Sequence, residues 1–298
     1  MNINSTLKQQ LYYFPPAIAQ KTCQILLPIA RHRFIHTLRL LGFIVSSKRC
    51  KSPAPPIEFL RRTALYKKDD LNYLAVPEIH EISGLLQLTS WCRSLYKCDV
   101  TFSRAKHILE FGCGCARLIK HFRYTSGVNL GGCDLDREMV SWCQSSFPEI
   151  QFFKNNTEPP LDAVASDSID LIIACSVFTH IDLRNQNEWL TELRRVLKPC
   201  GVLLCDVLSL SQARKNLSHS LQQELIQFGV VTIKSDDSES SYSSQVTGQL
   251  DVYYTPAEIN KRFVQGFTLL NFSPGDLDLL ILKKTTEDQS TSPLSWFI

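Results

Sequence analysis

Two glycines and two cysteines alternate at positions 112–115, inside the stretch "HILEFGCGCARLIKHF" (107–122). The chain has eleven cysteines, but they form no Cys-x-x-Cys pair and no His-rich segment accompanies them, so the usual zinc spacing is missing. Cys133, Cys175 and Cys205 lie in apolar runs, where cysteine behaves as a small hydrophobic residue. We therefore expect reduced thiols, as in a cytosolic protein, and neither a metal nor a disulfide beside these glycines.

Gly112, Gly114 and Asp134 have the spacing of a nucleoside site. Glycines that follow a strand let the backbone approach a ligand, and a helix that begins there offers free N–H groups to an anion. Asp134 comes 22 positions after Gly112, where a carboxylate can accept hydrogen bonds from both hydroxyls of a ribose. The dinucleotide fingerprint needs a glycine at 117, but the chain has Arg117 there, and Glu110 would repel a pyrophosphate. The pattern therefore favours a nucleoside ligand without a pyrophosphate.

The elements that must position these residues alternate between helix and strand from residue 57 onward. Short apolar runs indicate buried parallel strands, and apolar residues at helical spacing indicate the helices between them. The predicted strands are 107–111, 128–134, 150–154, 168–178 and 201–208, and the predicted helices are 79–96, one starting at 115, 137–147 and 187–199. This alternation predicts a parallel sheet with helices on both faces and ligands at the carboxyl ends of its strands.

The C-terminal part of the chain predicts the elements that close the sheet. Residues 255–258, Thr-Pro-Ala-Glu, form a capping box with proline at the first helical position, so a helix begins there. Tyr253 and Tyr254 precede this helix and either pack beneath it, which we favour, or contact a substrate. The segments 267–272 and 277–284 are predicted to form an antiparallel pair.

Five segments occur in the order and at the spacing of one enzyme superfamily. They are "ILEFGCGCARLIKHF", "GCDLDREMVSWCQSSFP", "FKNNTEPPL", "IDLIIACSVFTHI" and "WLTELRRVLKPCGVLLCDV". Over residues 57–285 the chain resembles class I S-adenosylmethionine-dependent methyltransferases, in a branch with many small-molecule and glycan methyltransferases. The resemblance implies an α/β fold with a Rossmann-like, doubly wound, mostly parallel seven-stranded sheet and an antiparallel last strand. It also implies S-adenosyl-L-methionine as cofactor and methyl transfer (EC 2.1.1.-) to a small-molecule or glycan acceptor, which we expect at oxygen.

The resemblance also implies which residues contact the cofactor. They are Glu110, Gly112 and Gly114 of the first motif, Asp134 at the ribose, Leu135 at the adenine, Asn155 at the adenine amino edge, and Ser176 where the fourth strand passes the methionine. Structural roles are the alternatives: Glu110 and Asp134 as caps of strand ends, and Asn155 or its neighbour Asn156 as a turn former. A buried acid beside glycines is costly without a partner, so we favour ligand contact for the two acids.

Two residues depart from the family pattern. Ala116 stands where a third glycine is usual, and Cys200 replaces the first glycine of the usual Lys-Pro-Gly-Gly turn. We expect the first departure to be tolerated, and the second to affect its turn but not the ligand site. Arg117 is interpreted as a structural residue that pairs with an acid to hold the loop.

His180 is the candidate catalytic residue. Methyl transfer to a hydroxyl requires alignment of the acceptor and removal of its proton, and a histidine, with an ordinary pKa near 6.5, suits that task. His180 lies just beyond the fourth predicted strand, at the ligand end of the sheet. The alternative is that it caps or packs at the helix start beside Asp182. The Ser-rich segment 235–249 is long enough to be a lid over the acceptor.

The excess of basic over acidic residues lies near the N-terminus. Residues 1–57 contain eight Lys or Arg and no Asp or Glu. The segment 25–45 is apolar, but Pro28 and three arginines interrupt it, so it predicts an amphipathic helix and not a membrane span. Three roles remain open for this helix: contact with an anionic membrane, an organelle address, or packing on the domain. Because the excess of basic over acidic residues is confined to this arm and no basic face with interleaved aromatic residues appears, a nucleic-acid partner is disfavoured.

We therefore predict three regions: a basic extension and linker (1–56, with 46–56 as the linker), a methyltransferase domain (57–285) and a flexible tail (286–298). The predicted enzyme is cytoplasmic, with peripheral membrane contact through the arm as an open possibility. Two functions of other classes remain open from the sequence. One is a non-catalytic module that binds S-adenosylmethionine, and the other is a membrane-recruited scaffold.

Overall fold

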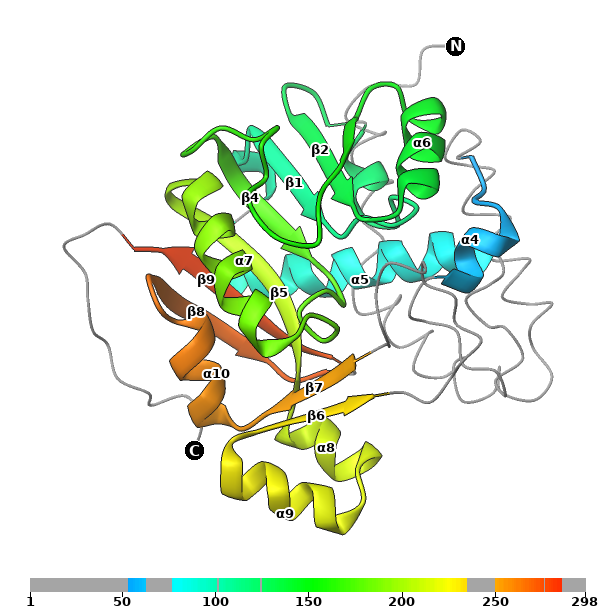
Figure 1. Cartoon of the computed structure of the whole chain (residues 1–298). Coiled ribbons are helices and arrows are strands. Elements are labelled where there is room, and N and C mark those ends of the chain that lie inside the picture. The colour runs from blue at the N-terminus through cyan, green and yellow to red at the C-terminus, as the bar shows by residue number, and fades with distance from the viewer. Residues whose placement is uncertain are drawn as a thin grey trace.

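The computed structural model describes residues 53–62, 77–100, 102–123, 125–234, 250–275 and 277–285. Within these ranges, one sheet carries helices on both of its faces (Figure 1). Three of the expected elements lie outside the described residues: the amphipathic helix at 25–45, the lid at 235–249 and the tail at 286–298. Most of the linker expected at 46–56 lies outside them as well.

Seven strands form the main sheet in the order β3-β2-β1-β4-β5-β9-β8. Their bounds are β1 His107–Phe111, β2 Asn129–Asp134, β3 Gln151–Lys154, β4 Ile169–Ala174, β5 Leu197–Ser209, β8 Phe267–Ser273 and β9 Asp278–Lys284. β1 to β5 are mutually parallel, whereas β9 runs antiparallel to both β5 and β8. The predicted doubly wound, mostly parallel seven-stranded sheet with an antiparallel last strand is therefore confirmed.

Helices bury both faces of the sheet because its strands are apolar on both sides. One hydrophobic cluster joins the sheet to α7 (Leu183–Val196) and α10 (Pro256–Phe263), through residues such as Trp189 and Phe263. The other joins it to α5 (Pro77–Lys97) and α6 (Arg137–Ser146), through residues such as Trp91 and Val140. A short helix, α4 (Ile57–Arg62), precedes α5. In the described ranges, no helix combines the length and the apolar character needed to cross a membrane.

Side-chain caps fix where the helices of the sheet begin. Asp182 caps α7 by accepting hydrogen bonds from the amides of Arg184 and Asn185, so the cap of this helix is Asp182 and not His180. Thr255 caps α10 through the amide of Glu258, with proline at the first helical position, as the capping box predicts. These local signals place both helix starts correctly.

Two predicted elements differ from the structure. The helix expected from residue 115 is instead a run of turns followed by the short 3-10 helix η3 (Ile119–Phe122). The backbone of Ala116 has φ of +57°, which interrupts a right-handed helix at that residue. The strand expected at 168–178 ends at Ala174, because Ser176 also adopts a left-handed conformation. Both differences lie at the carboxyl edge of the sheet.

An unpredicted excursion between β5 and α10 extends this same edge. It consists of α8 (Leu210–Asn216), α9 (His219–Phe228), β6 (Val230–Lys234) and β7 (Leu250–Tyr254). β6 and β7 pair antiparallel, and β7 runs parallel to the last two residues of β5, Leu208 and Ser209. The β6–β7 ribbon therefore continues the sheet beyond the point where β9 stops pairing with β5, and Figure 1 shows it with α8 and α9 beneath the main sheet.

Candidate functional site

The carboxyl ends of β1, β2 and β4 lie side by side and bring the glycine loop together with Asp134 and Ser176. The loop turns sharply, with φ of +73° at Gly112 and +48° at Gly114. The amides of Gly112 and Cys113 both donate to the carbonyl oxygen of Cys133, at 2.9 Å each. The loop is therefore folded back onto the end of β2, at the edge where doubly wound sheets bind ligands.

Gly112 is required by space as well as by backbone conformation. A Cβ atom at this position would lie 2.4 Å from Cγ2 of Val177, far inside van der Waals contact. Val177 belongs to the turn that follows β4. The glycine thus lets the turn after β4 pack directly on the loop after β1, which joins two walls of the site.

Asp134 holds the glycine loop in place. Its side chain is buried, and Oδ2 accepts a hydrogen bond from the amide of Gly114 at 2.7 Å while Oδ1 accepts one from the amide of Asp136 at 2.9 Å. Each carboxylate oxygen has two lone pairs, so the carboxylate has further capacity to accept hydrogen bonds. The predicted contact with a ribose stays a prediction, and Asp134 has a structural role beside it.

Glu110 also has an internal partner. Its Oε2 accepts a hydrogen bond from the amide of Ile119 at 2.8 Å, and burial raises the pKa of its carboxyl to about 8, against the opposing effects of this hydrogen bond and of Arg117. Glu110 thus has a structural contact at the start of η3, which differs from the cap of a strand end considered from the sequence. Its predicted contact with the cofactor stays a prediction.

Asn155 carries the strongest sign of a missing ligand atom. Its Nδ2 donates to the carbonyl oxygen of Asn156 at 2.8 Å, but its Oδ1 is buried and has no hydrogen-bond partner within the described part of the chain. A buried acceptor without a partner costs about 1–3 kcal/mol, so such atoms are rare unless a ligand or water satisfies them. The exocyclic amino group of an adenine would supply the donor. Leu135, half-buried after β2, precedes Asp136, whose carboxylate caps α6.

His180 lies beside the β6–β7 ribbon, at the end of the turn after β4. Its Nδ1 is 2.8 Å from the carbonyl oxygen of Leu250 and 3.6 Å from Oδ1 of Asp251. Because a carbonyl oxygen only accepts hydrogen bonds, Nδ1 carries the hydrogen, and the lone pair of a neutral imidazole is then on Nε2. The amide of Val252 also donates to the carbonyl oxygen of Thr179 at 3.0 Å, which fixes the turn against β7. The contact with Leu250 thus uses Nδ1 of the imidazole and leaves Nε2 as the basic nitrogen.

Residues 108–201 match the family model described as a methyltransferase domain. The matched segment spans β1 to the start of β5 and contains the glycine loop, the five other predicted cofactor residues and His180. The chain has a class I S-adenosylmethionine-dependent methyltransferase domain. S-adenosylmethionine is the methyl donor of this family, and the protein is a methyltransferase (EC 2.1.1.-).

Solved structures similar to this methyltransferase come from several organisms. A protein of Pyrococcus horikoshii is 14% identical, with a TM-score of 0.48, over 67% of this chain and 92% of that chain. A methyltransferase of Methanosarcina mazei is 16% identical, with a TM-score of 0.46, over 61% of this chain and 93% of that one. A 1,6-didemethyltoxoflavin-N1-methyltransferase of Burkholderia thailandensis, with bound 1,6-didemethyltoxoflavin and S-adenosylhomocysteine, is 16% identical, with a TM-score of 0.43, over 61% and 72%.

Ion pairs fasten the N-terminal helices of the methyltransferase to the loops of the site. Arg62 of α4 lies 3.2 Å from Asp136 and 2.7 Å from Glu138, at the start of α6. Glu81 of α5 pairs with Lys120 of η3 at 2.5 Å, and both side chains are buried. Breaking the buried Glu81–Lys120 pair would leave an uncompensated charge, so this pair fixes α5 against η3. The partly exposed pairs of Arg62 connect α4 to the start of α6.

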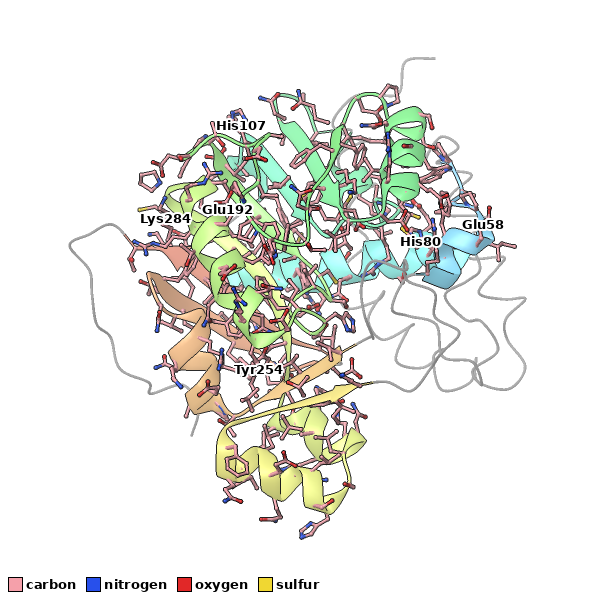
Figure 2. The ribbon with its side chains drawn as sticks, in the orientation of Figure 1. Glu58, His80, His107, Glu192, Tyr254 and Lys284 are labelled. Carbon is pink, nitrogen blue, oxygen red and sulfur yellow. The ribbon has the colours of Figure 1, made fainter. Side chains whose placement is uncertain are left out.

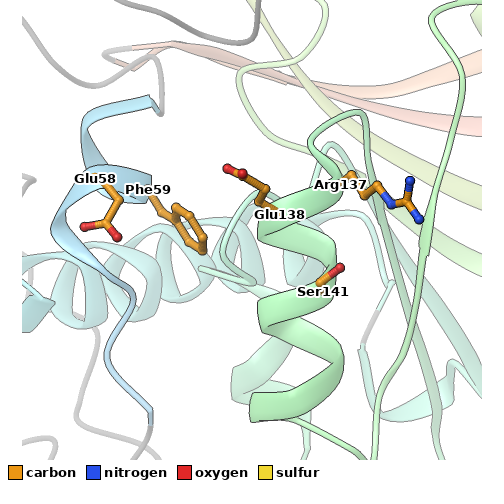
Figure 3. A pocket seen from close by; sticks show the side chains of 5 residues that line it. All are labelled: Glu58, Phe59, Arg137, Glu138 and Ser141. Carbon is orange, nitrogen blue, oxygen red and sulfur yellow. The ribbon is translucent and has the colours of Figure 1, made fainter.

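A shallow hollow lies between α4 and α6 (Figure 3). Glu58 and Phe59 form its wall on α4, and Arg137, Glu138 and Ser141 form the wall on α6. None of the residues that we match to the cofactor lines this hollow.

Tyr254 packs in the core, as favoured from the sequence (Figure 2). Its hydroxyl donates to Oε1 of Gln186 at 2.6 Å, and its ring meets that of Phe263 edge-on. Tyr253 is buried in the separate cluster beneath α8 and α9. Both tyrosines belong to β7, so they lie in a strand and not in a loop before the helix.

Two acids near the site were not singled out from the sequence. Asp251 follows Leu250 at the start of β7 and was hidden in a segment with no clear strand pattern. Asp206 lies within the apolar run of β5, buried, and accepts a hydrogen bond from the amide of Ser176 at 2.6 Å. The signal that could have found Asp206 is its type, since a carboxylate inside a buried strand needs a partner.

Proposed function

We propose that this methyltransferase transfers a methyl group from S-adenosylmethionine to a hydroxyl of a small-molecule or glycan acceptor, with His180 as general base. The observation that carries the proposal is the hydrogen bond from Nδ1 of His180 to Leu250, which directs the lone pair to Nε2. A base of this kind is needed for a hydroxyl, which must lose its proton as it is methylated.

The described residues provide a binding frame for the cofactor. Asn155 offers its unpartnered Oδ1 to the adenine amino group, Leu135 lies beside the ring, and Asp134 accepts from the ribose. Gly112 and Gly114, with Glu110 beneath them, and Ser176 border the methionine part. When bound, S-adenosylmethionine supplies an already activated methyl group on its sulfonium, so the protein mainly has to align the acceptor.

In the proposed step, Nε2 of His180 would take up the proton of the acceptor hydroxyl as that oxygen receives the methyl group that bound S-adenosylmethionine would supply. The resulting imidazolium is stabilised by the carbonyl oxygen of Leu250 and by the carboxylate of Asp251. S-adenosylhomocysteine and the methyl ether are the products. Asp251 is half-exposed, so we assign it an orienting role for the imidazole, with a modest electrostatic contribution.

The β6–β7 ribbon is the proposed element for acceptor recognition. The seven-stranded sheet is complete without it, yet the ribbon supplies both contacts of the catalytic imidazole. The segment 235–249, which joins the two strands, is proposed as a lid on the grounds of its length and polar composition. Variation in this excursion would change the acceptor while leaving the cofactor frame intact.

The acceptor is identified by labelling. Purified enzyme is incubated with methyl-labelled S-adenosylmethionine and fractionated extract of the source cells, and the labelled product is analysed by mass spectrometry. A methyl ether on a sugar or small molecule is the expected product. A methylated amine would contradict transfer to oxygen, and no labelled product with an enzyme that binds the cofactor would favour a non-catalytic binding module.

We further propose that the basic region 1–56 contacts an anionic membrane surface while the enzyme remains cytoplasmic. Eight basic residues without an acid in residues 1–57 support electrostatic attraction to such a surface. Replacing Arg31, Arg33 and Arg39 by glutamine in the full chain should lower the affinity for phosphatidylserine vesicles by about tenfold or more, because each basic residue near such a surface contributes up to roughly 1 kcal/mol. Affinity for S-adenosylhomocysteine should not change. Equal vesicle binding by both proteins would contradict the membrane role.

A further inference from the structure

The turn after β4 contains a strained residue at the edge of the cofactor site. Ser176 has φ of +57°, a left-handed conformation that costs a residue other than glycine of the order of 1 kcal/mol. The next residue, Val177, packs against Gly112 of the glycine loop. The position of this turn therefore sets the width of the site between the β1 loop and the β4 loop, where the methionine part of the cofactor is proposed to bind.

One buried carboxylate holds the strained turn. Asp206 lies on β5 one residue beyond the last partner of β4, since the two strands pair as far as Ala174 with Cys205. Its Oδ1 accepts from the amide of Ser176 at 2.6 Å, and its Oδ2 accepts from the thiol of Cys175 at 3.4 Å. A hydrogen bond to a charged acceptor is about twice as strong as a neutral one, which is enough to offset the strain at Ser176.

The same turn is tied to the glycine loop from the other side. Arg117 donates from Nη2 to the sulfur of Cys175 at 3.2 Å, so a chain of contacts runs from Arg117 through Cys175 to Asp206. It joins the loops after β1 and β4 to the strand β5. Arg117 thus contacts the loop after β4 through a thiol, whereas the sequence predicted pairing with an acid.

We propose that Asp206 is a positioning residue for the cofactor: its ionised carboxylate holds Ser176 in the left-handed conformation that keeps the methionine end of the site open. The inference rests on the cofactor site proposed above. Asp206 acts through Ser176 and is not itself a catalytic residue.

The surroundings of Asp206 make its charge sensitive to pH. Burial raises the pKa of this carboxyl to about 6, although the hydrogen bonds from Ser176 and Cys175 and the charge of Arg117 oppose the rise. Among the described residues, the titratable or charged groups that face Asp206 are Cys175, Arg117 and the preceding residue Cys205. The residue that pairs with Asp206 on β9 is the apolar Leu279. Acidification through pH 6 therefore protonates Asp206 and weakens its hold on Ser176.

Binding of S-adenosylhomocysteine, measured by calorimetry, tests the role directly. Asp206→Asn should lower the affinity about tenfold at pH 7.5, the equivalent of one lost charge-assisted hydrogen bond. The wild-type affinity should fall about fivefold between pH 7.5 and pH 5, whereas the affinity of D206N should change less than about twofold over that range. The pH series needs no variant to show the wild-type fall, so it remains informative even if D206N folds poorly.

A double-mutant cycle separates positioning from general stability. Glycine adopts positive φ without strain, so in the Ser176→Gly background the D206N substitution should cost less than about threefold in affinity. Asp170→Asn is the matched control, because Asp170 is a hydrogen-bonded carboxylate of the same sheet, at the opposite ends of its strands. It should lower stability and leave the affinity within about twofold.

Two results would overturn the inference but not the cofactor site. One is that wild type and D206N bind S-adenosylhomocysteine with the same affinity. The other is that D206N lowers this affinity equally with serine and with glycine at position 176. A wild-type protein that does not bind S-adenosylhomocysteine at all would overturn the proposed site itself, and the inference with it.

Discussion

The two edges of the parallel sheet use carboxylates in opposite ways. At the amino ends of the strands, burial alone would raise the pKa of Asp170, but hydrogen bonds from Lys198 and from the amides of His107 and Lys106 lower it. At the carboxyl ends, burial outweighs such partners and raises the pKa of Glu110 to about 8 and that of Asp206 to about 6. A lowered carboxyl pKa stabilises the folded state near neutral pH and a raised one destabilises it. The ionised forms of Glu110 and Asp206 therefore cost stability at the carboxyl edge.

The largest expected loss of stability at the carboxyl edge is that of Gly112→Ala. The substitution should lower the free energy of unfolding by about 3 kcal/mol, because a left-handed backbone and a Cβ 2.4 Å from Val177 add their costs. Gly127→Ala is the control, since Gly127 has the same φ of +73° but no atom within 4 Å of its missing Cβ. It should lose only about 1 kcal/mol in urea denaturation. Equal losses in both variants would mean that contact with Val177 is not what requires Gly112.

Glu110→Gln should remove a pH dependence that the amino edge does not have. Folding favours the protonated carboxyl of Glu110, so the stability that this proton confers is fully present below the ordinary carboxyl pKa of 4.5 and is lost as pH rises from there through about 8. The wild-type free energy of unfolding should fall about 1 kcal/mol more than that of E110Q between pH 7 and pH 9. Glu188→Gln, at a largely exposed position on α7, is the control. Parallel pH curves for wild type and E110Q would show that Glu110 is already ionised at pH 7.

Cys200→Gly should give a small gain at the amino edge. Cys200 is exposed and has φ of +63°, so the turn keeps the left-handed shape that the usual glycine would favour. Glycine should raise the free energy of unfolding by about 0.5–1 kcal/mol and leave affinity for S-adenosylhomocysteine unchanged. A destabilised C200G protein, measured by thermal melting, would mean that the thiol makes a contact that outweighs the relieved strain.

The sequence was sufficient wherever the determining signal is local. The apolar runs predicted β1 to β5, β8 and β9, and the capping box predicted the start of α10. These signals depend on residues within a few positions of each other, so periodicity and capping preferences detect them.

The departures from prediction all depend on contacts between distant segments. The loop after β1 is held by two hydrogen bonds, from the amide of Gly114 to Asp134 and from the amide of Ile119 to Glu110. The loop forms in place of the helix that local propensity favoured. The β6–β7 ribbon depends on pairing with the end of β5, and Asp206 meets Ser176 only because β4 and β5 are neighbours. Of the eight predicted site residues, the structure places Gly112, Gly114, Asp134 and Ser176 together at one edge. The sequence could not reveal that Asp134 and Glu110 also have internal partners.

The pH–rate profile of the methyltransferase tests the central claim most directly, with wild type compared with His180→Ala on the acceptor identified by labelling. H180A should lower the turnover number by about 10²- to 10⁴-fold, the usual contribution of a positioned general base, with affinity for S-adenosylhomocysteine unchanged. The wild-type rate should fall at acid pH as the imidazole takes up a proton, and the variant should lose this dependence. His219→Ala, at an exposed position on α9, should behave as wild type. A variant that keeps the acid limb and loses less than about tenfold in rate would contradict His180 as the base.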